Sequence, residues 1–302
     1  MKLSGWIIYS RAEAERNQAY IDKYMASAER LHIHLRLLLA ENISCGFDTC
    51  RPLICEDGRA AVLPDFVINR TRDPFIAYHL EAMGLPVFNR GIISDICLDK
   101  RRTMQLASAA GLPVMPSVFC SALGEWPDWY GLPWQGATVI KPANGHGGYG
   151  VQLVRTESEY LDALRRYAVM EGPPVNELII QQAAGDLGRD LRVYVIGGHI
   201  EAAMLRRSDP ERDFRSNYCL GGEAIVHELN HQEKVLIKQL INKLEFGLVG
   251  IDLIYDDGQP ILNEIEDVVG SRMLYSMTDI DIADRYLEHI VKMVRRGWLP
   301  VV

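Results

Sequence analysis

Residues 249–266, with the sequence VGIDLIYDDGQPILNEIE, decide the fold, because they predict a β-hairpin with acidic side chains on one face. Both arms alternate between apolar and other residues at period two, and an Asp-Gly pair between such arms is typical of a hairpin turn. With residues 256–260 as the loop, Tyr255 lies opposite Ile261. This one pairing fixes the partner of every other residue in the hairpin. The side chains of directly opposite residues lie on the same face of the sheet.

The same register gathers three carboxylates at one place. Asp252 lies opposite Glu264, and Glu266 is two residues further along that face. Three carboxylates this close repel one another unless a cation joins them. Oxygen ligands and retained waters suit Mg²⁺, which usually binds substrate phosphates as well. The hairpin therefore predicts a magnesium site and chemistry on phosphate.

The composition is that of an ordinary folded protein. The chain has 302 residues, of which 48% are hydrophobic and 24% charged, enough for two domains or three small lobes. A net charge of −8 argues against a nucleic-acid binder. No stretch approaches the roughly 18 apolar residues that a membrane helix needs, so we expect no membrane partner. Six cysteines are too few for a disulfide scaffold, and we expect reduced thiols in a cytoplasmic protein.

The N-terminal part alternates between predicted strands and helices, which is typical of a parallel α/β unit. The helix over 17–41 follows apolar residues from Ile21 to Leu35. The helix after Asp73-Pro74 has a capping residue followed by a proline suited to the first turn. The expected strands are 3–9, 65–69 and 85–89, and this lobe closes near residue 95.

The sequence after residue 95 predicts a different arrangement of strands and helices. A Gly197-Gly198 pair joins two apolar segments as a second hairpin. Residues 124–136 hold three tryptophans and two prolines, which indicates a loop with a short helix. The expected helices are 99–111, 231–246 and 281–296, and the expected strands are 137–141, 151–154, 179–183, 191–196 and 199–205.

Residues 141–151, with the sequence KPANGHGGYGV, combine a lysine with four glycines. Glycines let backbone N–H groups approach an anion closely. The lysine precedes the glycines and a strand follows them, which differs from the Walker pattern of Gly-Lys-Ser/Thr before a helix. The segment predicts a strand-loop-strand flap over phosphates, with a flexible surface hairpin as the alternative.

Three further segments are candidates for nucleotide contacts. Arg215 and Asn217 would face one way in an extended segment, where arginine suits phosphate oxygens; a solvated charged loop is the alternative. Residues 181–183 could present backbone groups to an adenine edge, or be an ordinary buried strand end. Asp190 and Arg192 could contact the ligand, or form an ion pair with each other.

In this order, the segments resemble the ATP-grasp superfamily, and within it the RimK-like carboxylate–amine ligases, also called alpha-L-glutamate ligase-like. The resemblance implies an α/β (α+β) fold with a parallel N-terminal lobe (1–95), a small central lobe with the glycine-rich flap (96–185) and a C-terminal antiparallel lobe with the magnesium site (186–302). ATP would lie between the last two lobes. The motifs that carry the resemblance are Asp99-Lys100, Lys141-Pro142 to Gly150, Gln181-Gln182, Asp190-Leu191-Arg192-Val193, Asp213-Phe214-Arg215-Ser216-Asn217, Gly221-Gly222, Gly250-Ile251-Asp252 and Asn263-Glu264-Ile265-Glu266.

By position, the resemblance assigns the site residues. Lysines and Arg215 would contact phosphates, residues 181–183 would frame the adenine, and Asp190 would lie near the ribose. The catalytic candidates are Lys141 and Arg215. The metal set is Asp252, Glu264 and Glu266, holding two Mg²⁺ ions, for which Mn²⁺ could substitute. The nucleotide set is Lys100, Lys141, Gly147, Gly148, Gln181, Gln182, Ala183, Asp190, Arg192, Arg215 and Asn217.

One segment departs from the family pattern. Similar ligases usually carry asparagine at the position of Glu266, and the residues that follow also differ. Arg272 could answer the extra negative charge or bind a substrate carboxylate. Arg70 or Arg72, at the carboxyl end of the strand at 65–69, is predicted to contact an anionic substrate, with a helix cap and solvated arginines as the alternative.

The expected activity is an ATP-dependent carboxylate–amine ligase that works through an acylphosphate, for example one that adds glutamate. The expected partners are small-molecule or peptide carboxylates and amines, and related folds imply a homodimer or homotetramer. A small-molecule kinase with the same Mg-ATP site and a non-catalytic nucleotide-binding module are the alternatives. His146 in the flap is the candidate general base, although a solvent-exposed loop histidine fits it equally well.

Overall fold

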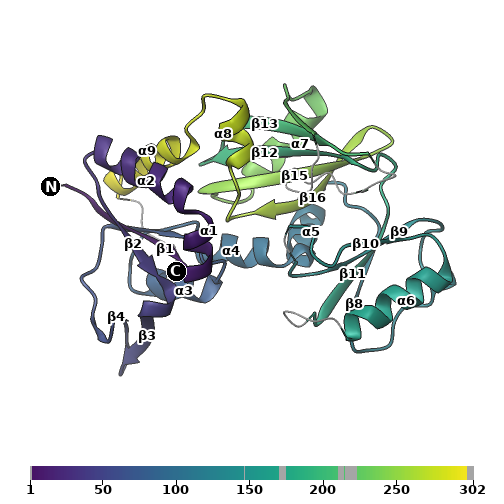
Figure 1. Ribbon diagram of the computed structural model, residues 1–302, viewed down its shortest axis with the longest axis horizontal. Coiled ribbons are helices and arrows are strands. Elements are labelled where there is room, and N and C mark those ends of the chain that lie inside the picture. The colour runs from purple at the N-terminus through teal and green to yellow at the C-terminus, as the bar shows by residue number, and fades with distance from the viewer. Residues whose placement is uncertain (1, 146, 170–174, 210–213, 215–222, 298–302) are drawn as a thin grey trace.

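A computed structural model describes residues 2–145, 147–169, 175–209, 214 and 223–297, and within these ranges the chain forms four β-sheets with helices packed around them (Figure 1). None of the helices in these ranges has the length and apolar run that crossing a membrane requires. The domain boundaries at 95 and 185 stay predictions.

The N-terminal sheet is parallel and has the strand order β2-β1-β6-β7. Its strands are β1 (Ser4–Tyr9), β2 (His34–Leu39), β6 (Phe66–Asn69) and β7 (Val87–Phe88). The helices of this part are α1 (Arg11–Arg16), α2 (Gln18–Arg30), α3 (Pro74–Ala82) and α4 (Gly91–Leu98). The three predicted strands and the helix after Asp73 are confirmed, and Asp73 caps α3 by accepting from the Phe75 N–H.

The predicted helix over 17–41 is wrong in its second half. Helix α2 ends at Arg30, and His32 adopts a left-handed conformation (φ 56°) that turns the chain into β2. Leucines at 35, 37 and 39 satisfy the alternation of a strand, while Leu35 also continues the helical spacing. Parallel pairing of β2 with the buried strand β1 decides between the two.

A second, antiparallel sheet was not predicted. It contains β3 (Ile43–Asp48), β4 (Arg51–Glu56) and β5 (Arg59–Ala60), and follows the 3-10 turn η1 (Ala40–Asn42). Three of the cysteines lie in this segment. All five cysteines that the structure describes are free thiols.

The central part is an antiparallel sheet of order β10-β9-β11-β8. It encloses a core of its own around Ile140, Tyr160 and Ile180. Strands β9 and β10 pair across the glycine segment, so the predicted strand-loop-strand arrangement is confirmed. The elements are α5 (Lys100–Ala109), β8 (Ser117–Ser121), η2 (Trp129–Gly131), β9 (Thr138–Pro142), β10 (Gln152–Val154), α6 (Glu157–Ala168) and β11 (Glu177–Gln182).

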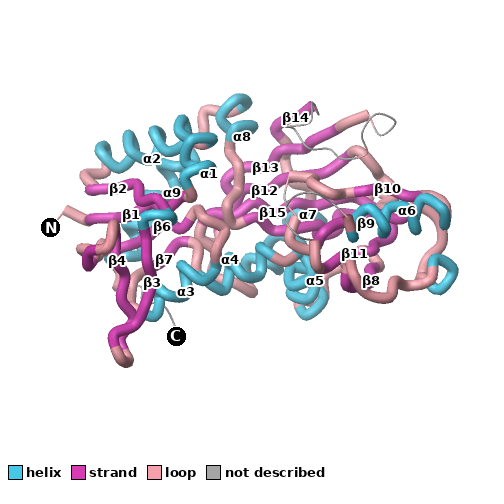
Figure 2. Tube along the Cα trace, turned by 60° about the horizontal axis from the view of Figure 1, so that its bottom comes forward, coloured by secondary structure: helices cyan, strands magenta, loops and turns pink. Residues whose placement is uncertain are grey.

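The C-terminal sheet is antiparallel, in the order β14-β13-β12-β15-β16. Helix α9 packs beside α2, so that one hydrophobic core joins this sheet to the N-terminal sheet (Figures 1 and 2). The elements are β12 (Arg189–Ile196), β13 (His199–Arg207), β14 (Glu223–Val226), α7 (His231–Ile241), β15 (Leu248–Asp256), β16 (Gln259–Glu266), α8 (Arg272–Met277) and α9 (Ile282–Arg295).

The β15–β16 hairpin reaches the predicted carboxylate pairing by a different register. Asp252 lies opposite Glu264 as predicted, but Tyr255 lies opposite Pro260 rather than Ile261. The turn is a tight two-residue turn at Asp257-Gly258, where both residues have positive φ. A bulge at Asn263 then supplies one extra residue and restores the pairing. The tighter turn and the bulge offset each other, so Asp252 and Glu264 remain opposite one another as predicted.

Candidate active site

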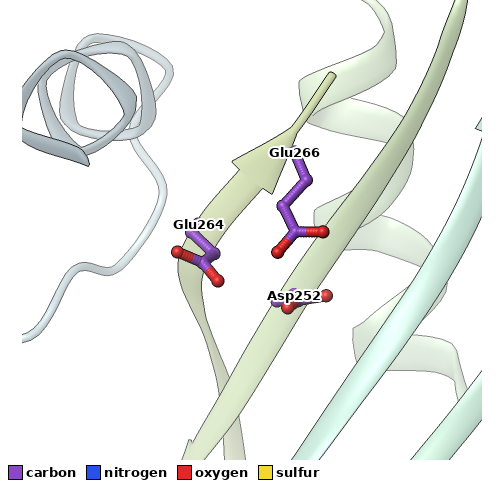
Figure 3. A group of neighbouring side chains, drawn as sticks. All are labelled: Asp252, Glu264 and Glu266. Carbon is purple, nitrogen blue, oxygen red and sulfur yellow. The ribbon is translucent and has the colours of Figure 1, made fainter. Parts of the chain in front are cut away.

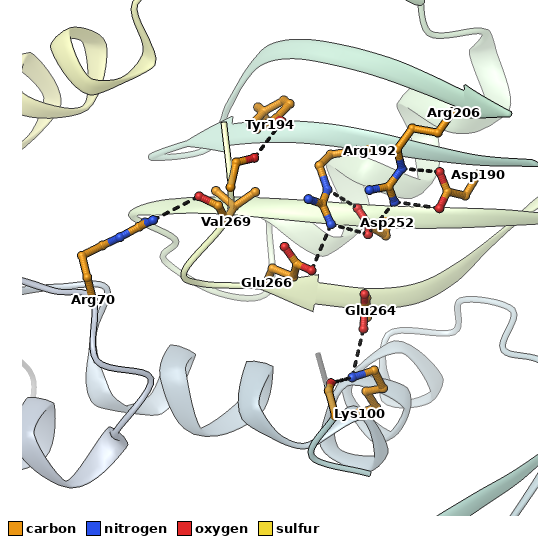
Figure 4. Close-up of polar contacts among 12 residues, drawn as sticks. Arg70, Lys100, Asp190, Arg192, Tyr194, Arg206, Asp252, Glu264, Glu266 and Val269 are labelled. Atoms are coloured by element: carbon orange, nitrogen blue, oxygen red, sulfur yellow. Dashed lines mark hydrogen bonds and ion pairs between the residues drawn. The ribbon is translucent and has the colours of Figure 1, made fainter. Parts of the chain in front are cut away.

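One face of the C-terminal sheet carries a row of charged side chains from four adjacent strands (Figure 4). Arg192 lies opposite Asp252 between β12 and β15, and Asp252 opposite Glu264 between β15 and β16. Opposite residues share one face, so pairing brings these groups together. From β13 to β16, the row consists of Arg206, Asp190, Arg192, Asp252, Glu264 and Glu266.

Two arginines form a buried ion-pair network with this row. Arg206 binds Asp190 in a fork of 2.5 and 2.7 Å and also donates to Asp252 at 2.9 Å. Arg192 binds both oxygens of Asp252 at 2.8 and 2.6 Å and reaches Glu266 at 3.0 Å. The suggested pair between Asp190 and Arg192 does not form, because each finds a better placed partner on a neighbouring strand. The network fixes the orientation of Asp252, which is 2% exposed.

The network also sets the charge of each acid. Burial acts to raise the pKa of Asp252, but Arg192 and Arg206 outweigh it and lower the pKa. Burial raises the pKa of Asp190 and of Glu266, although their arginine partners oppose the shift. Of Asp190, Asp252 and Glu266, Asp252 is therefore the most firmly ionised.

Asp252, Glu264 and Glu266 converge in the structure (Figure 3). Each offers one carboxylate oxygen, and these oxygens lie within 4.8 Å of one another. Glu264 is paired with Lys100 at 3.1 Å, and Lys100 also donates to the carbonyl oxygen of Gly145 in the glycine loop. A set of three carboxylates with solvent on one side fits the donor chemistry of Mg²⁺.

Lys141, at the end of β9, approaches the same place from the central sheet. Its ammonium donates to Asn263 Oδ1 at 3.0 Å, and the residue is 5% exposed. Burial, with the nearby charge of Lys100, lowers the pKa of Lys141 to about 8. An anion placed between the two lysines would offset their repulsion and the cost of burying charge.

A pocket that opens to solvent lies between the central and C-terminal sheets above these groups. Gly147 and Gly148 lie on its wall with φ of 63° and 78°, conformations that favour glycine. The predicted nucleotide residues that line it are Lys100, Lys141, Gly147, Gly148, Gln181, Gln182 and Asp190, and Asp252 and Glu264 lie at its floor.

Some predicted nucleotide residues lie elsewhere. Ala184 rather than Ala183 lines the pocket, and the Ala183 N–H donates to Ala137 O. Arg192 faces the carboxylates instead of the pocket wall. Arg215, Asn217 and His146 lie outside the described residues, although Phe214 is on the pocket wall.

Two important residues were missed from sequence. Asn263, the bulge residue, holds Lys141, and Arg206 holds Asp190 and Asp252. Counting from the Gly197-Gly198 turn places Leu205 opposite Asp190, but a register shift beyond Tyr194 places Arg206 there. Both residues depend on bulges, and neither bulge has a clear sequence signal.

The two arginines predicted to meet a substrate have different positions. Arg70 is 4% exposed and donates to the Val269 carbonyl at 3.1 Å (Figure 4) and also to the Tyr9 hydroxyl at 3.3 Å. It therefore ties the N-terminal sheet to the C-terminal part. Arg72 lines a second pocket, beside the Glu264 and Glu266 carboxylates.

This chain is similar to known proteins in both sequence and fold. The model of the RimK-like ATP-grasp domain matches residues 99–290. The chain is 26% identical over 269 residues to a "Probable alpha-L-glutamate ligase 1" of Shewanella sp. (strain W3-18-1), covering 86% of this chain and 88% of that protein.

Solved structures extend the likeness to the whole fold. A D-alanine–D-alanine ligase from Bacillus anthracis has a TM-score of 0.72 at 17% identity, covering 99% of each chain. A RimK domain ATP-grasp protein from Sphaerobacter thermophilus has a TM-score of 0.69 at 15% identity, covering 95% of this chain and 99% of that one. The predicted α/β fold of the ATP-grasp type is thus confirmed. The chain belongs to the RimK-like ATP-grasp family.

Proposed function

We propose that this protein is an ATP-dependent carboxylate–amine ligase that forms an amide bond and releases ADP and phosphate. One observation carries the proposal: three carboxylates converge beside two lysines at the edge of a pocket that the glycine-rich loop also lines. Membership of the RimK-like ATP-grasp family supports the same activity.

The pocket divides into regions suited to the parts of ATP. Lys100, Lys141 and the glycine loop would hold the phosphates, and residues 181–184 would hold the adenine. Asp190 would lie near the ribose, with its carboxylate already fixed by Arg206. Arg215 and Asn217 are proposed to complete the phosphate site.

Asp252, Glu264 and Glu266 would hold the Mg²⁺ that accompanies ATP, with two ions and Mn²⁺ substitution as the finer proposal. Bound Mg²⁺ would offset the charge on the transferring phosphate. In the structure, Lys100 pairs with Glu264. With Glu264 holding the ion, Lys100 would be available to the phosphates. Arg192 balances the charge of Glu266 and keeps it beside Asp252.

The chemistry needs activation because a free carboxylate is a poor electrophile. Its oxygen attacks the γ-phosphorus of ATP, which gives an acylphosphate and ADP. An amine then attacks the acyl carbon, phosphate leaves, and the amine loses a proton. Lys100, Lys141 and Arg215 would stabilise the negative charge during the transfer. The glycine loop would exclude water, which otherwise hydrolyses the acylphosphate.

The substrates are proposed from the relatives. Proteins named alpha-L-glutamate ligases are 26% identical to this chain, so an amino acid such as glutamate is the first amine to test. The acid partner is a small molecule or a peptide. A cytoplasmic location and a dimeric or tetrameric state are also proposed.

The test is a screen of purified protein with ATP, Mg²⁺ and pooled carboxylic acids and amines, followed by measurement of ADP and by mass spectrometry. A ligase forms ADP in step with a product whose mass equals acid plus amine minus water. A kinase forms ADP and a stable phosphorylated product without any amine, and a binding module forms neither.

Two matched variants on one hairpin make the screen specific. Asp252→Asn should abolish ADP formation, because it removes the carboxylate of the metal set whose pKa Arg192 and Arg206 hold low. Asp257→Asn, in the exposed turn of the same hairpin, should leave the activity unchanged. Equal activity of the two variants would contradict the assigned site.

A further inference from the structure

The chain between the end of β16 and the start of α8 has no regular secondary structure, yet much of it is buried. This segment, residues 267–271, directly follows Glu266 of the proposed metal set. Its residues Asp267, Val269 and Ser271 are all less than a tenth exposed. Buried carbonyl oxygens need hydrogen-bond donors, and this segment has no neighbouring strand to supply them.

Two of the donors that the segment uses belong to the N-terminal sheet. Asn89, directly after β7, donates its side-chain N–H to the Asp267 carbonyl oxygen at 3.1 Å. Arg70, directly after β6, donates to the Val269 carbonyl oxygen at 3.1 Å (Figure 4). Both donors are at most 4% exposed. Since β6 and β7 are parallel neighbours, the carboxyl ends of two adjacent strands hold the segment.

A third donor belongs to the C-terminal sheet. The hydroxyl of Tyr194, on β12, donates to the Gly270 carbonyl oxygen at 3.0 Å, and the residue is fully buried. The segment is therefore held from two different sheets at once. We call the three donors, Arg70, Asn89 and Tyr194, the carbonyl clamp.

Arg70 is the member of the clamp that costs most to bury. Its guanidinium lies 5.9 Å from the ring centroid of Tyr9 and 5.4 Å from that of Tyr20, and it forms no ion pair within the ranges that the structure describes. A buried guanidinium without a carboxylate is costly, and an apolar side chain of similar length would avoid that cost. The backbone contact that an apolar side chain would lose is the one to Val269.

Val269 lies beside the proposed metal site. A Cβ at Gly250 would clash with the Val269 side chain and would also touch Arg192 Nε, so Val269 packs directly on the Gly250 backbone beside that arginine. Gly250 is the β15 partner of Glu266, and Arg192 pairs with Glu266 at 3.0 Å. The segment thus folds back over the strand position opposite Glu266 and lies against the arginine that binds it.

We propose that the carbonyl clamp positions Glu266 for the metal, so that residues of the N-terminal sheet help to set the Mg²⁺ affinity of the site. The β15–β16 ladder ends at Glu266, and the clamp fixes the backbone that follows. Without the clamp, the end of β16 is free to move and Glu266 leaves its place beside Asp252. The clamp residues are positioning residues that touch neither metal nor nucleotide. This inference rests on the proposed function, whose metal set includes Glu266.

The test measures Mn²⁺ binding directly, with full-length protein saturated with a non-hydrolysable ATP analogue. Relaxation of water protons reports the Mn²⁺ that is bound to protein. Arg70→Met should raise the half-saturating Mn²⁺ concentration by about tenfold, because partners behind metal ligands contribute that much. Arg70→Lys, which can still donate to Val269, should recover part of the loss. Affinity for the analogue without metal should stay within about twofold.

Two further variants separate positioning from folding. Arg30→Gln removes a different contact between the N-terminal and C-terminal parts, the ion pair of α2 with Asp284 on α9, and should leave Mn²⁺ binding unchanged. Tyr194→Phe keeps the buried ring and removes only the hydroxyl, so it should fold and weaken Mn²⁺ binding by about threefold. Unchanged Mn²⁺ binding in Arg70→Met or in Tyr194→Phe, with only the melting temperature lowered, would overturn the proposal.

A double-mutant cycle tests whether the clamp acts through Glu266. Glu266→Gln should itself weaken Mn²⁺ binding, because it removes a charged ligand. Adding Arg70→Met to Glu266→Gln should then change the half-saturating concentration by less than about twofold, since the two changes remove the same contribution. An equal effect of Arg70→Met in both backgrounds would show that Arg70 acts by another route, and would also overturn the proposal.

The outcomes distinguish this inference from the function it rests on. A wild-type protein that binds no Mn²⁺ together with the ATP analogue would overturn both. Normal Mn²⁺ binding that is insensitive to the clamp variants would overturn the positioning role alone and leave the ligase proposal standing.

Discussion

Proton uptake on binding of ATP should test whether the buried Lys141 lies at the proposed phosphate site. Lys141 is 5% exposed, and burial together with the charge of Lys100 lowers its pKa to about 8. Phosphate oxygens beside the ammonium favour its charged form and raise the pKa again. Binding of Mg-ATP must therefore take up protons wherever Lys141 is neutral in the free protein.

The magnitude follows from the pKa of the free state. If ATP raises the pKa of Lys141 well above the range studied, uptake should be about 0.1 proton at pH 7, about 0.5 at pH 8 and about 0.9 at pH 9. Affinity for Mg-ATP should fall across the same pH range, because Lys141 must take up a proton on binding and the proton concentration falls as the pH rises.

The assay is calorimetric titration in buffers that differ in ionisation enthalpy. The slope of the observed enthalpy against the buffer enthalpy gives the number of protons taken up. Lys141→Arg is the matched control, since arginine keeps the charge and does not titrate in this range. Uptake that is the same in this variant, or that does not rise with pH, would refute the placement of Lys141 at the phosphates.

The same lowered pKa has a consequence for stability. In the unfolded chain Lys141 has an ordinary lysine pKa, so below pH 8 both states carry the charge and the full cost of burying it is present. The shift from 10.5 to about 8 corresponds to roughly 3 kcal/mol at neutral pH. Between about pH 8 and 10.5 the unfolded state binds more protons, so this cost disappears as the pH rises.

Three further predictions concern the arginine network, the proposed metal ligands and the packing of β1. Arg206→Met should lower the free energy of unfolding by about 3–5 kcal/mol in urea titrations, because it leaves Asp190 buried without its cation; a loss below 1 kcal/mol would contradict the network. Glu264→Gln should raise the half-saturating Mg²⁺ concentration for ADP formation by about tenfold or more, since it removes one charged ligand, and an unchanged Mg²⁺ dependence would remove it from the metal set. Gly5→Ala should cost about 1–3 kcal/mol of stability, because its Cβ would clash with the buried ring of Phe66; wild-type stability would show that the ring can move.

The acidic hairpin shows why a site can be predicted while its details are not. Alternation and the Asp-Gly turn correctly place Asp252 opposite Glu264. The predicted loop was longer than the observed turn and shifted the predicted register by one residue. The bulge at Asn263 offsets this shift. Alternation specifies which face a side chain occupies, and bulges depend on twist and packing that local sequence does not encode.

The arginine network could not be predicted from the sequence, for a related reason. Arg206 meets Asp190 only because β12 and β13 shift register beyond Tyr194. The strand β2 was mistaken for helix because its leucines fit both periods, and only pairing with β1 resolves the ambiguity. Motif order sufficed to identify the family, whereas contacts between strands required the structure.

The central claim is that a substrate carboxylate is activated by phosphate from ATP. Once the acid and amine are identified, the acid should be supplied with ¹⁸O in its carboxylate, and the released phosphate examined by mass spectrometry. The account predicts that one ¹⁸O atom appears in phosphate for each amide formed, because the carboxylate oxygen that attacks ATP leaves with the phosphate. Phosphate without the label, or label in a stable phosphorylated product made without the amine, would contradict it.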